Sequence, residues 1–451
     1  MTMDRGASLE QGLRTAGFDD ADVRGRSQLL RRTIDAFSTT AGRPPSWCWH
    51  VPGRIEIFGK HTDYAGGESL LAAVPRGFAV VAGPRDDQHV RVIDARHHEE
   101  VLVSLDDREP PLRGWANYVA VTARRLRANF PDRMFGADIA IASDLPRAAG
   151  VSSSSALVVG IATALMRRSQ VASTERWARA ITSVDDLAWY LGCVENGLTY
   201  RDLPGTAGVG THGGSQDHTA ILGCRPGTVS RFGFMPVSRL ADIAMPSDWR
   251  FIVMSSGVHA DKAGSVRERY NRASLAVRAL VGLCQEPSGW TGASLTAALR
   301  HAPDAEARLR SRLHEIPVDG FSATDLERRL TALVGELERI PRAAQAFATA
   351  DATLLGEVTR ASQRAAEELL GNQIPETVAL ARLAEEAGAF AASAFGAGFG
   401  GSVWAMAHAT DADAVAARWR MAYERACHPT GHVEHFTCRP GPPVVEVLSE
   451  S

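Results

Sequence analysis

The sequence has few cysteines, no long apolar run and no strong charge of either sign. Its six cysteines are scattered over 451 residues without a CxxC pair, which argues against a zinc site or a disulfide framework and fits a reducing compartment. No apolar stretch approaches the ~18 residues that a transmembrane helix needs, and the N-terminal segment lacks the apolar centre of a signal peptide. The net charge is −3, which gives no bulk electrostatic reason to expect nucleic acid or membrane as partners. We therefore expect a cytoplasmic protein.

What the sequence does contain is typical of a soluble α+β protein. Apolar residues make up 45% and charged residues 22%, and a chain of this length usually forms two domains. Short runs rich in Val and Ile predict strands, and apolar residues at helical spacing predict helices. Strands are expected at 53–59, 77–84, 89–96, 100–107, 136–146, 250–258, 402–409 and 442–449. Helices are expected within 8–40, at 115–130, 152–169 and 184–198, and over most of 265–385. A domain boundary is expected near 225–245.

One glycine-rich stretch, "GRIEIFGKHTDYAGG" at 53–67, nearly matches the phosphate-binding P-loop. Five residues separate Gly53 from Gly59, where the P-loop has four, and His61 follows Lys60 in place of Ser or Thr. Because the cradle depends on that spacing, we reject the P-loop interpretation. "GVGTHG" at 208–213 matches a dinucleotide-binding pattern by count, but no strand of a βαβ unit is predicted before it, so we reject that interpretation as well.

Two further stretches favour close contact between backbone and a ligand. In "DLPRAAGVSSSSALVVG" at 144–160, a glycine and four serines precede a helix. The first N–H groups of a helix have no internal partner and carry partial positive charge, so this end suits a phosphate. The alternative is a plain serine N-cap. In "FGAGFGGSVW" at 395–404, the glycines allow either close approach of a ligand or a tight turn between strands.

Together, in this order, the three stretches resemble motifs of the GHMP small-molecule kinases, and most closely those of galactokinases. The galactokinase signature, roughly PGRVNLIGEHTDYNGG, corresponds to "PGRIEIFGKHTDYAGG". The family's phosphate loop, PxGxGLSSSA, corresponds to "PRAAGVSSSSA", with Ala148 in place of its first glycine, and GAGFGG is unchanged at 396–401. The likeness extends over nearly the whole chain.

The resemblance implies a two-lobed α+β fold with mixed or antiparallel sheets and an active site between the lobes. We place the lobes at 1–235 and 236–451. The family uses ATP and Mg²⁺ to phosphorylate a hydroxyl of a small metabolite, which in galactokinases is the anomeric hydroxyl. The expected partners are therefore a sugar and ATP, bound by a monomer or a small homo-oligomer.

Residue roles follow from the resemblance position by position. The ATP phosphates are expected at Gly150, Ser152, Ser153, Ser154 and Gly398. Mg²⁺ is expected at Ser154 and at Glu195, which lies in "CVENGL". The alternative for Glu195 is a solvated charge at a helix end.

The resemblance also implies a catalytic pair. Asp217 lies in "GGSQDH", the counterpart of a GIMDQ-like motif, with Gln216 in place of Met and His218 in place of Gln. Such a carboxylate can orient a sugar hydroxyl or take its proton. Arg54 aligns with the arginine that keeps this Asp ionised and can meet the transferring phosphoryl group. The alternative for Asp217 is a structural carboxylate.

Sugar contacts are expected from His61 and Asp63, for which the alternative is turn capping. A further contact is expected from Arg267 or, with a short insertion, from Tyr270. Galactokinases carry Glu where this chain has Lys60, which reverses the charge and removes an acceptor.

Two substrate classes remain open at this point. Cations near carbon 6 would suit a uronic acid such as galacturonate. Alternatively Lys60 pairs with Glu56 or Glu68 and the substrate is galactose or another neutral sugar. A sensor that binds sugar and ATP without turnover is a further alternative, although such a protein has no need of the pair formed by Arg54 and Asp217.

Overall fold

A computed structural model describes residues 5–106, 112–146, 150–258, 264–288, 292 and 294–449. The first of its two sheets has the strand order β12-β1-β2-β5-β3-β4, and β6 pairs with both β2 and β7. Its strands are β1 Trp47–Phe58, β2 Glu68–Pro84, β3 His89–Asp94, β4 Glu99–Ser104, β5 Ala137–Ser143, β6 Thr228–Gly233, β7 Ser238–Ala244 and β12 Val445–Ser449. The second sheet has the order β11-β8-β10-β9. Its strands are β8 Trp249–Ser255, β9 Ala391–Ala394, β10 Ser402–His408 and β11 His435–Cys438.

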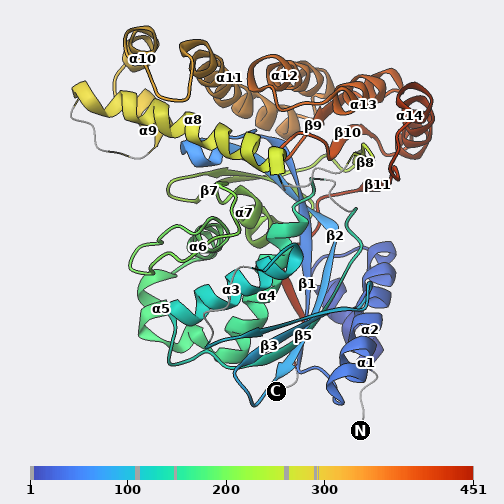
Figure 1. Cartoon of the computed structure of the whole chain (residues 1–451). Helices are drawn as coiled ribbons and strands as arrows, with labels where there is room; N and C mark the ends of the chain where they lie inside the picture. Colours follow the sequence, from blue (N-terminus) through green and yellow to red (C-terminus); the bar gives the residue numbers. More distant parts are fainter. Residues whose placement is uncertain are drawn as a thin grey trace.

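The helices divide between the two sheets, and those after residue 264 form the upper layer in Figure 1. The earlier helices are α1 Arg5–Thr15, α2 Asp20–Ala41, α3 Trp115–Asn129, α4 Ser153–Ser169, α5 Glu175–Ala180, α6 Val184–Asn196 and α7 Gln216–Gly223, with short turns η1 Asp63–Ala65 and η2 Val171–Ser173. The later helices are α8 Gly264–Ser288, α9 Leu295–Arg300, α10 Ala305–Glu315, α11 Ala323–Ala348, α12 Ala352–Ala365, α13 Pro375–Glu386 and α14 Ala412–Cys427, with a π-helical turn η3 Ala366–Leu370. In the described part of the chain, no helix combines the length and apolarity needed to cross a membrane.

The long antiparallel pair β1–β2 organises the first lobe. The strands pair from Trp47 opposite Ala82 to Phe58 opposite Leu70, with irregularities at 52/54 and 56/58. Successive strand residues face opposite sides of a sheet. Ala79 and Val81 accordingly pack in the core beneath α1 and α2, whereas Val80 packs in the core on the side of α4.

The second sheet is also covered on both faces. Buried Trp419 and Tyr423 of α14 pack on one face with α13. On the other face, Phe347 of α11 packs with Trp249 of β8 and belongs to the same apolar core as the first sheet. The two lobes therefore share one continuous core, which fixes the position of one against the other.

The lobe boundary that we placed at 235 lies between two strands of the first sheet, β6 and β7. Strand β7, Ser238–Ala244, still belongs to the first sheet, and the second sheet begins with β8 at Trp249. The last strand, β12, returns to the first sheet and pairs with β1, so the two termini both lie at the lower end of Figure 1. Most predicted elements are present, but β6, β7, β9, β11, α5 and α7 were not predicted.

Candidate active site

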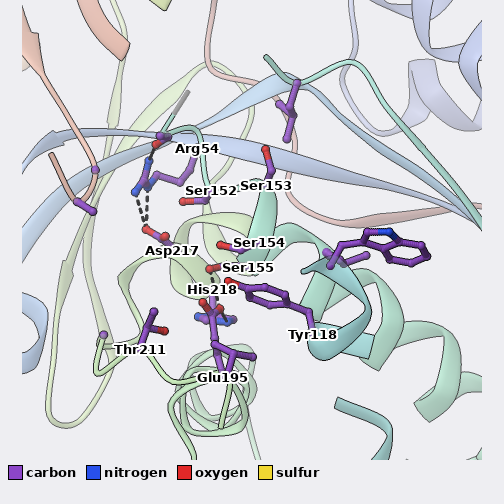
Figure 2. A pocket seen from close by; sticks show the side chains of 18 of the residues that line it. Arg54, Tyr118, Ser152, Ser153, Ser154, Ser155, Glu195, Thr211, Asp217 and His218 are labelled. Carbon is purple, nitrogen blue, oxygen red and sulfur yellow. Dashed lines mark hydrogen bonds and ion pairs between the residues drawn. The ribbon is translucent and has the colours of Figure 1, made fainter. Parts of the chain in front are cut away.

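A cavity of about 950 Å³ lies where the three glycine-rich stretches meet. Its lining includes the end of β1, the start of α4, the start of α7 and the loop between β9 and β10. Figure 2 shows side chains of these elements converging on it. Segments from the beginning, middle and end of the chain thus form one site.

An ion pair stands at the centre of the cavity. Arg54 of β1 donates from Nε and Nη2 to Oδ1 of Asp217, each at 2.8 Å, as the dashed lines in Figure 2 mark. Arg54 is 3% exposed and also donates to the carbonyl of Gly150. The guanidinium therefore connects the helix that carries Asp217 to the serine-rich loop, and the structure brings together two residues far apart in sequence.

The serine-rich loop presents hydroxyls and a helix N-terminus to the cavity. Ser152 has φ 63° and precedes the first residue of α4, Ser153. The buried Ser152 Oγ has no hydrogen-bond partner within the described ranges. Ser152, Ser153, Ser154 and Gly150 all line the cavity. An orphaned hydroxyl beside free helical N–H groups is an arrangement suited to an anion such as phosphate.

Next to this helix end, Glu195 of α6 is buried and accepts a 2.8 Å hydrogen bond from Ser155 Oγ. The Nε2 atom of His218 lies 3.1 Å from Glu195 Oε2. Glu195 thus lies at the cavity rather than in solvent. Its direct serine partner is Ser155, which was not predicted from the sequence. The available signal was the run of four serines, in which Ser155 directly follows the expected Ser154.

The oxygen atoms at this end fit a hard cation such as Mg²⁺. Carboxylate and hydroxyl oxygens are its preferred ligands, and Mg²⁺ at phosphoryl-transfer sites usually needs only one or two carboxylates besides the phosphates. Glu195 and the serine hydroxyls of this loop, Ser154 among them, would supply such a set. When bound, the cation would neutralise phosphate charge.

Asp63 lies in the floor of the cavity beside α7. Its Oδ2 accepts the backbone N–H of Gln216 at 3.1 Å, and its Oδ1 accepts the N–H of Tyr64 at 2.9 Å. Gly214 is required here, because a Cβ at that position would lie 2.2 Å from Asp63 Oδ2. Burial raises the pKa of Asp63 to about 6 against these hydrogen bonds.

His61 is held by both lobes. Its Nδ1 lies 2.5 Å from the hydroxyl of Tyr64, and its Nε2 lies 3.2 Å from Nδ2 of Asn372. The ring of Tyr270 is 5.9 Å from the His61 ring. Arg267 also lines the cavity but is exposed and lies beside Gly210. Of the two residues left open by the sequence, Tyr270 is the one beside the other expected sugar contacts.

Lys60 does not point into the cavity. Its Nζ donates to Ser393 Oγ at 2.8 Å and to Ser362 Oγ at 3.1 Å, both in the C-terminal lobe. Ser362 in turn donates to Glu336 of α11. Lys60 is absent from the described residues that line the cavity. The contact that we expected between this ammonium and the sugar therefore has no support in the described lining, because Lys60 is directed toward buried serines of the second lobe.

The charged groups around Lys60 form a buried set. Burial lowers the pKa of Lys60, and Glu336 and Glu56 oppose that shift. Burial alone would raise the pKa of Glu336, but Lys60 and the N–H of Gly59 hold it below its ordinary value. The expected alternative partner Glu68 instead pairs with Arg231 and Arg300.

Glu56 was considered only as a partner for Lys60, but the structure places it in the cavity lining. It lies two residues after Arg54 on β1, so both side chains face the same side of the sheet. Its Oε2 accepts a 2.5 Å hydrogen bond from Nε2 of Gln216. Burial raises the pKa of Glu56 to about 7. The sequence signal that could have identified Glu56 is the alternation of side chains along β1, which places residue 56 on the same face as Arg54.

The loop between β9 and β10 closes the cavity from the second lobe. Gly398 has φ 82°, and a Cβ there would lie 2.2 Å from the carbonyl of Asn372. Phe399 donates its N–H to that same carbonyl at 2.6 Å. Gly396 lies against the serine-rich loop, where a Cβ would be 3.0 Å from the carbonyl of Gly150. The glycines thus serve both a turn between strands and close backbone approach.

The cavity continues past the serines to a second, aromatic end. Trp115 and Tyr118 of α3 line it there together with Asp94 at the end of β3 and His97 of the β3–β4 turn. Trp115 donates from its indole to Glu99 at 2.7 Å. The sequence analysis did not predict this end of the site.

Comparison with known proteins identifies the family. The galactokinase galactose-binding signature matches residues 35–84, the GHMP kinase N-terminal domain matches 117–185 and the GHMP kinase C-terminal domain matches 343–425. Galactokinase of Roseiflexus sp. (strain RS-1) is 26% identical over 423 residues, covering 92% of this chain and 97% of the relative. Galactokinase of Chloroflexus aurantiacus is 29% identical over 393 residues, covering 85% of this chain and 89% of the relative.

Solved structures agree on the fold. Lactococcus lactis galactokinase complexed with galactose superposes with a TM-score of 0.73 at 20% identity, covering 92% of this chain and 99% of that chain. Methanococcus jannaschii mevalonate kinase superposes with a TM-score of 0.53 at 11% identity, covering 87% and 98%. The chain is a galactokinase-like sugar kinase of the GHMP family.

Proposed function

We propose that this protein transfers the γ-phosphoryl group of ATP to the anomeric hydroxyl of a neutral, galactose-like sugar. The single observation that supports this most is the ion pair of Arg54 and Asp217 between the serine-rich loop and the residues of the galactokinase signature. Phosphoryl transfer needs an oriented nucleophile beside positioned phosphates, and this pair lies between the two.

The remaining roles follow from position. Asp217 orients the sugar hydroxyl and accepts its proton, while Arg54 keeps that carboxylate ionised and faces the transferring group. Gly150, Ser152, Ser153, Ser154 and Gly398 lie where the ATP phosphates would bind, and the aromatic end with Trp115 suits the base of the nucleotide. Asp63, His61 and Tyr270 form the sugar end.

The position of Lys60 favours a neutral sugar over a uronic acid. Its ammonium donates to Ser362 and Ser393, and the carboxylates of Asp63 and Glu56 line the sugar end in its place. An anionic substituent would meet negative charge there. Because a site with buried polar groups rejects a mismatched analogue by ~10⁴-fold, the preference should be pronounced.

The test is ADP release with Mg-ATP and galactose, galacturonate or no sugar, with phosphate-position analysis of the product. We expect galactose or a close neutral relative to be phosphorylated at carbon 1. Turnover of galacturonate at an equal or better rate would refute the neutral-sugar proposal. Binding of both ligands without ADP release by the wild-type protein would favour the sensor.

A further inference from the structure

A buried acceptor is left over at the sugar end of the cavity. Glu56 is 4% exposed and lines the cavity. Its Oε2 is bonded to Gln216, but Oε1 has no hydrogen-bond partner among the residues that the structure describes. Leaving a buried acceptor unsatisfied costs about 1–3 kcal/mol, more for a charged group. Such an atom in a binding site calls for a donor from the ligand.

The surroundings hold Glu56 in this position from two sides. Gln216 donates to Glu56 through Nε2 and to Asp63 through its backbone N–H, and it accepts from Ser69 Oγ at 3.0 Å. The amide orientation of Gln216 is therefore fixed by Ser69, with its NH₂ toward Glu56. The two departures from the family motifs, Glu for Asn at 56 and Gln for Met at 216, thus contact each other.

We propose that Glu56 is a specificity-determining residue whose Oε1 accepts a hydrogen bond from a non-anomeric hydroxyl of the sugar. The proposal rests on the proposed function and deepens it. Galactokinases carry an acceptor at the position of Lys60. Here the Lys60 side chain donates to serines of the second lobe, and an acceptor lies four residues earlier, at Glu56 near the end of β1. The substrate class that fits is a neutral sugar with a hydroxyl donor at that place, not a uronic acid.

The proposal carries a pH dependence with a definite sign. Glu56 is faced by Arg54 of β1, by Lys60 in the turn after β1 and by Asp217 of α7. Its pKa of about 7 reflects burial first, opposed by the two cations and Gln216. Only the ionised form offers two acceptor oxygens. Sugar affinity should therefore rise as the pH increases from 6 to 8, and sugar binding should release protons.

The experiment pairs Glu56 variants with galactose and its 2-, 3-, 4- and 6-deoxy derivatives. Glu56→Met should raise the KM for galactose roughly 10- to 100-fold, the range expected for a hydrogen bond to a charged group. The deoxy sugar that lacks the contacting hydroxyl should bind the wild type weakly. Its KM should rise by less than about threefold further in Glu56→Met. Glu56→Gln should flatten the step near pH 7 in the galactose KM, while the KM for ATP stays within about threefold in both variants.

A matched control variant and direct measurements of sugar binding distinguish a failure of this proposal from a failure of the proposed function. Glu68→Met removes a carboxylate from the adjacent strand outside the cavity, and its galactose KM should stay near the wild-type value. Equal losses for galactose and every deoxy sugar in Glu56→Met, or no loss at all, would overturn the proposal. If the wild type binds galactose without turnover, the proposed function fails, but calorimetric Kd values over the same panel still decide the role of Glu56.

Discussion

At the residue scale, the geometry of Arg54 makes it irreplaceable by another cation. Its planar group contacts both Asp217 and the carbonyl of Gly150, which a lysine ammonium cannot do with the same directions. We predict that Arg54→Lys lowers kcat about 100-fold or more, the scale of a misplaced proton acceptor. The measurement is steady-state ADP release at saturating ATP and sugar.

Arg420→Lys is the matched control for Arg54→Lys. Arg420 pairs with Glu424 on the surface of α14, and such exposed pairs contribute only ~0–1 kcal/mol. Its kcat should equal that of the wild type. Full activity of the Arg54→Lys protein would show that the ion pair of Arg54 and Asp217 is not needed for turnover.

Buried carboxylates also predict how stability changes with pH. The folded-state pKa values of Glu56 and Asp63 are raised to about 7 and about 6 from ordinary values of 4.5 and 3.8. Between the ordinary and raised values, the folded protein binds more protons than the unfolded chain, so stability falls as pH rises. Without ligands, Glu56→Gln should flatten the part of that fall between about pH 4.5 and 7. Denaturant titrations at several pH values measure it, and an unchanged slope would contradict the shifted pKa of Glu56.

At the scale of elements, Lys60 joins the end of β1 to three elements of the second lobe. Its two serine partners lie on α12 and β9, and Ser362 links it to Glu336 of α11. We predict that Lys60→Met destabilises the protein by about 3 kcal/mol, because it removes one of two cations, Lys60 and Arg339, beside the buried carboxylate of Glu336. Thermal and denaturant unfolding measure the loss.

Removing the partner as well tests that explanation. Glu336→Gln combined with Lys60→Met should cost less than the sum of the two single changes. Lys60→Glu, which restores the family residue, would place a second carboxylate near Glu336. This change should destabilise the protein and should not improve its use of galactose. A stable Lys60→Glu protein with improved galactose turnover would show instead that residue 60 reaches the sugar.

A second element-scale prediction concerns the start of α4. Ser155 fixes Glu195 through a 2.8 Å hydrogen bond at the edge of the cavity. Ser155→Ala should raise the Mg²⁺ concentration needed for half-maximal rate several-fold, because a carboxylate held in place binds a cation more tightly than a mobile one. Ser311→Ala removes a similar serine–glutamate bond from the surface of α10 and should leave the Mg²⁺ requirement unchanged. Equal requirements in both variants would contradict a role for Ser155 in arranging the metal end.

At the scale of the whole molecule, the last strand supports the strand that carries Arg54. Strand β12 pairs with β1 from Trp47 opposite Ser449 to His50 opposite Val445, and Val447 is buried. Deleting residues 443–451 should lower the melting temperature and expose the edge of β1 to association with other chains. Light scattering and thermal unfolding measure both. Val447→Ala, which keeps the pairing, should lower stability less and leave the protein unassociated.

Much of the fold was predictable because local patterns were strong. Alternating Val and Ile marked β3, β4 and β5, and helical spacing marked α3, α4 and α6. The short strands β9 and β11 have four residues each, too few for a pattern. Helix α7, which carries Asp217, follows a glycine-rich loop and has only eight residues. The return of β12 to the first sheet depends on pairing across the chain, which no local signal contains.

The sequence by itself determined the family and the loops, because turns rich in glycine and a run of serines at the start of a helix are local features with few possible structures. Its motifs also singled out Arg54, His61 and Asp63, which the structure places in the lining of one cavity with residues of α7. Only the tertiary structure decided what Lys60 does. Its partner Ser362 lies 302 positions away, and a long side chain at a strand end follows whichever buried groups pack against it. The same packing leaves the carboxylates of Glu56 and Asp63, and not the ammonium of Lys60, in the lining of the cavity.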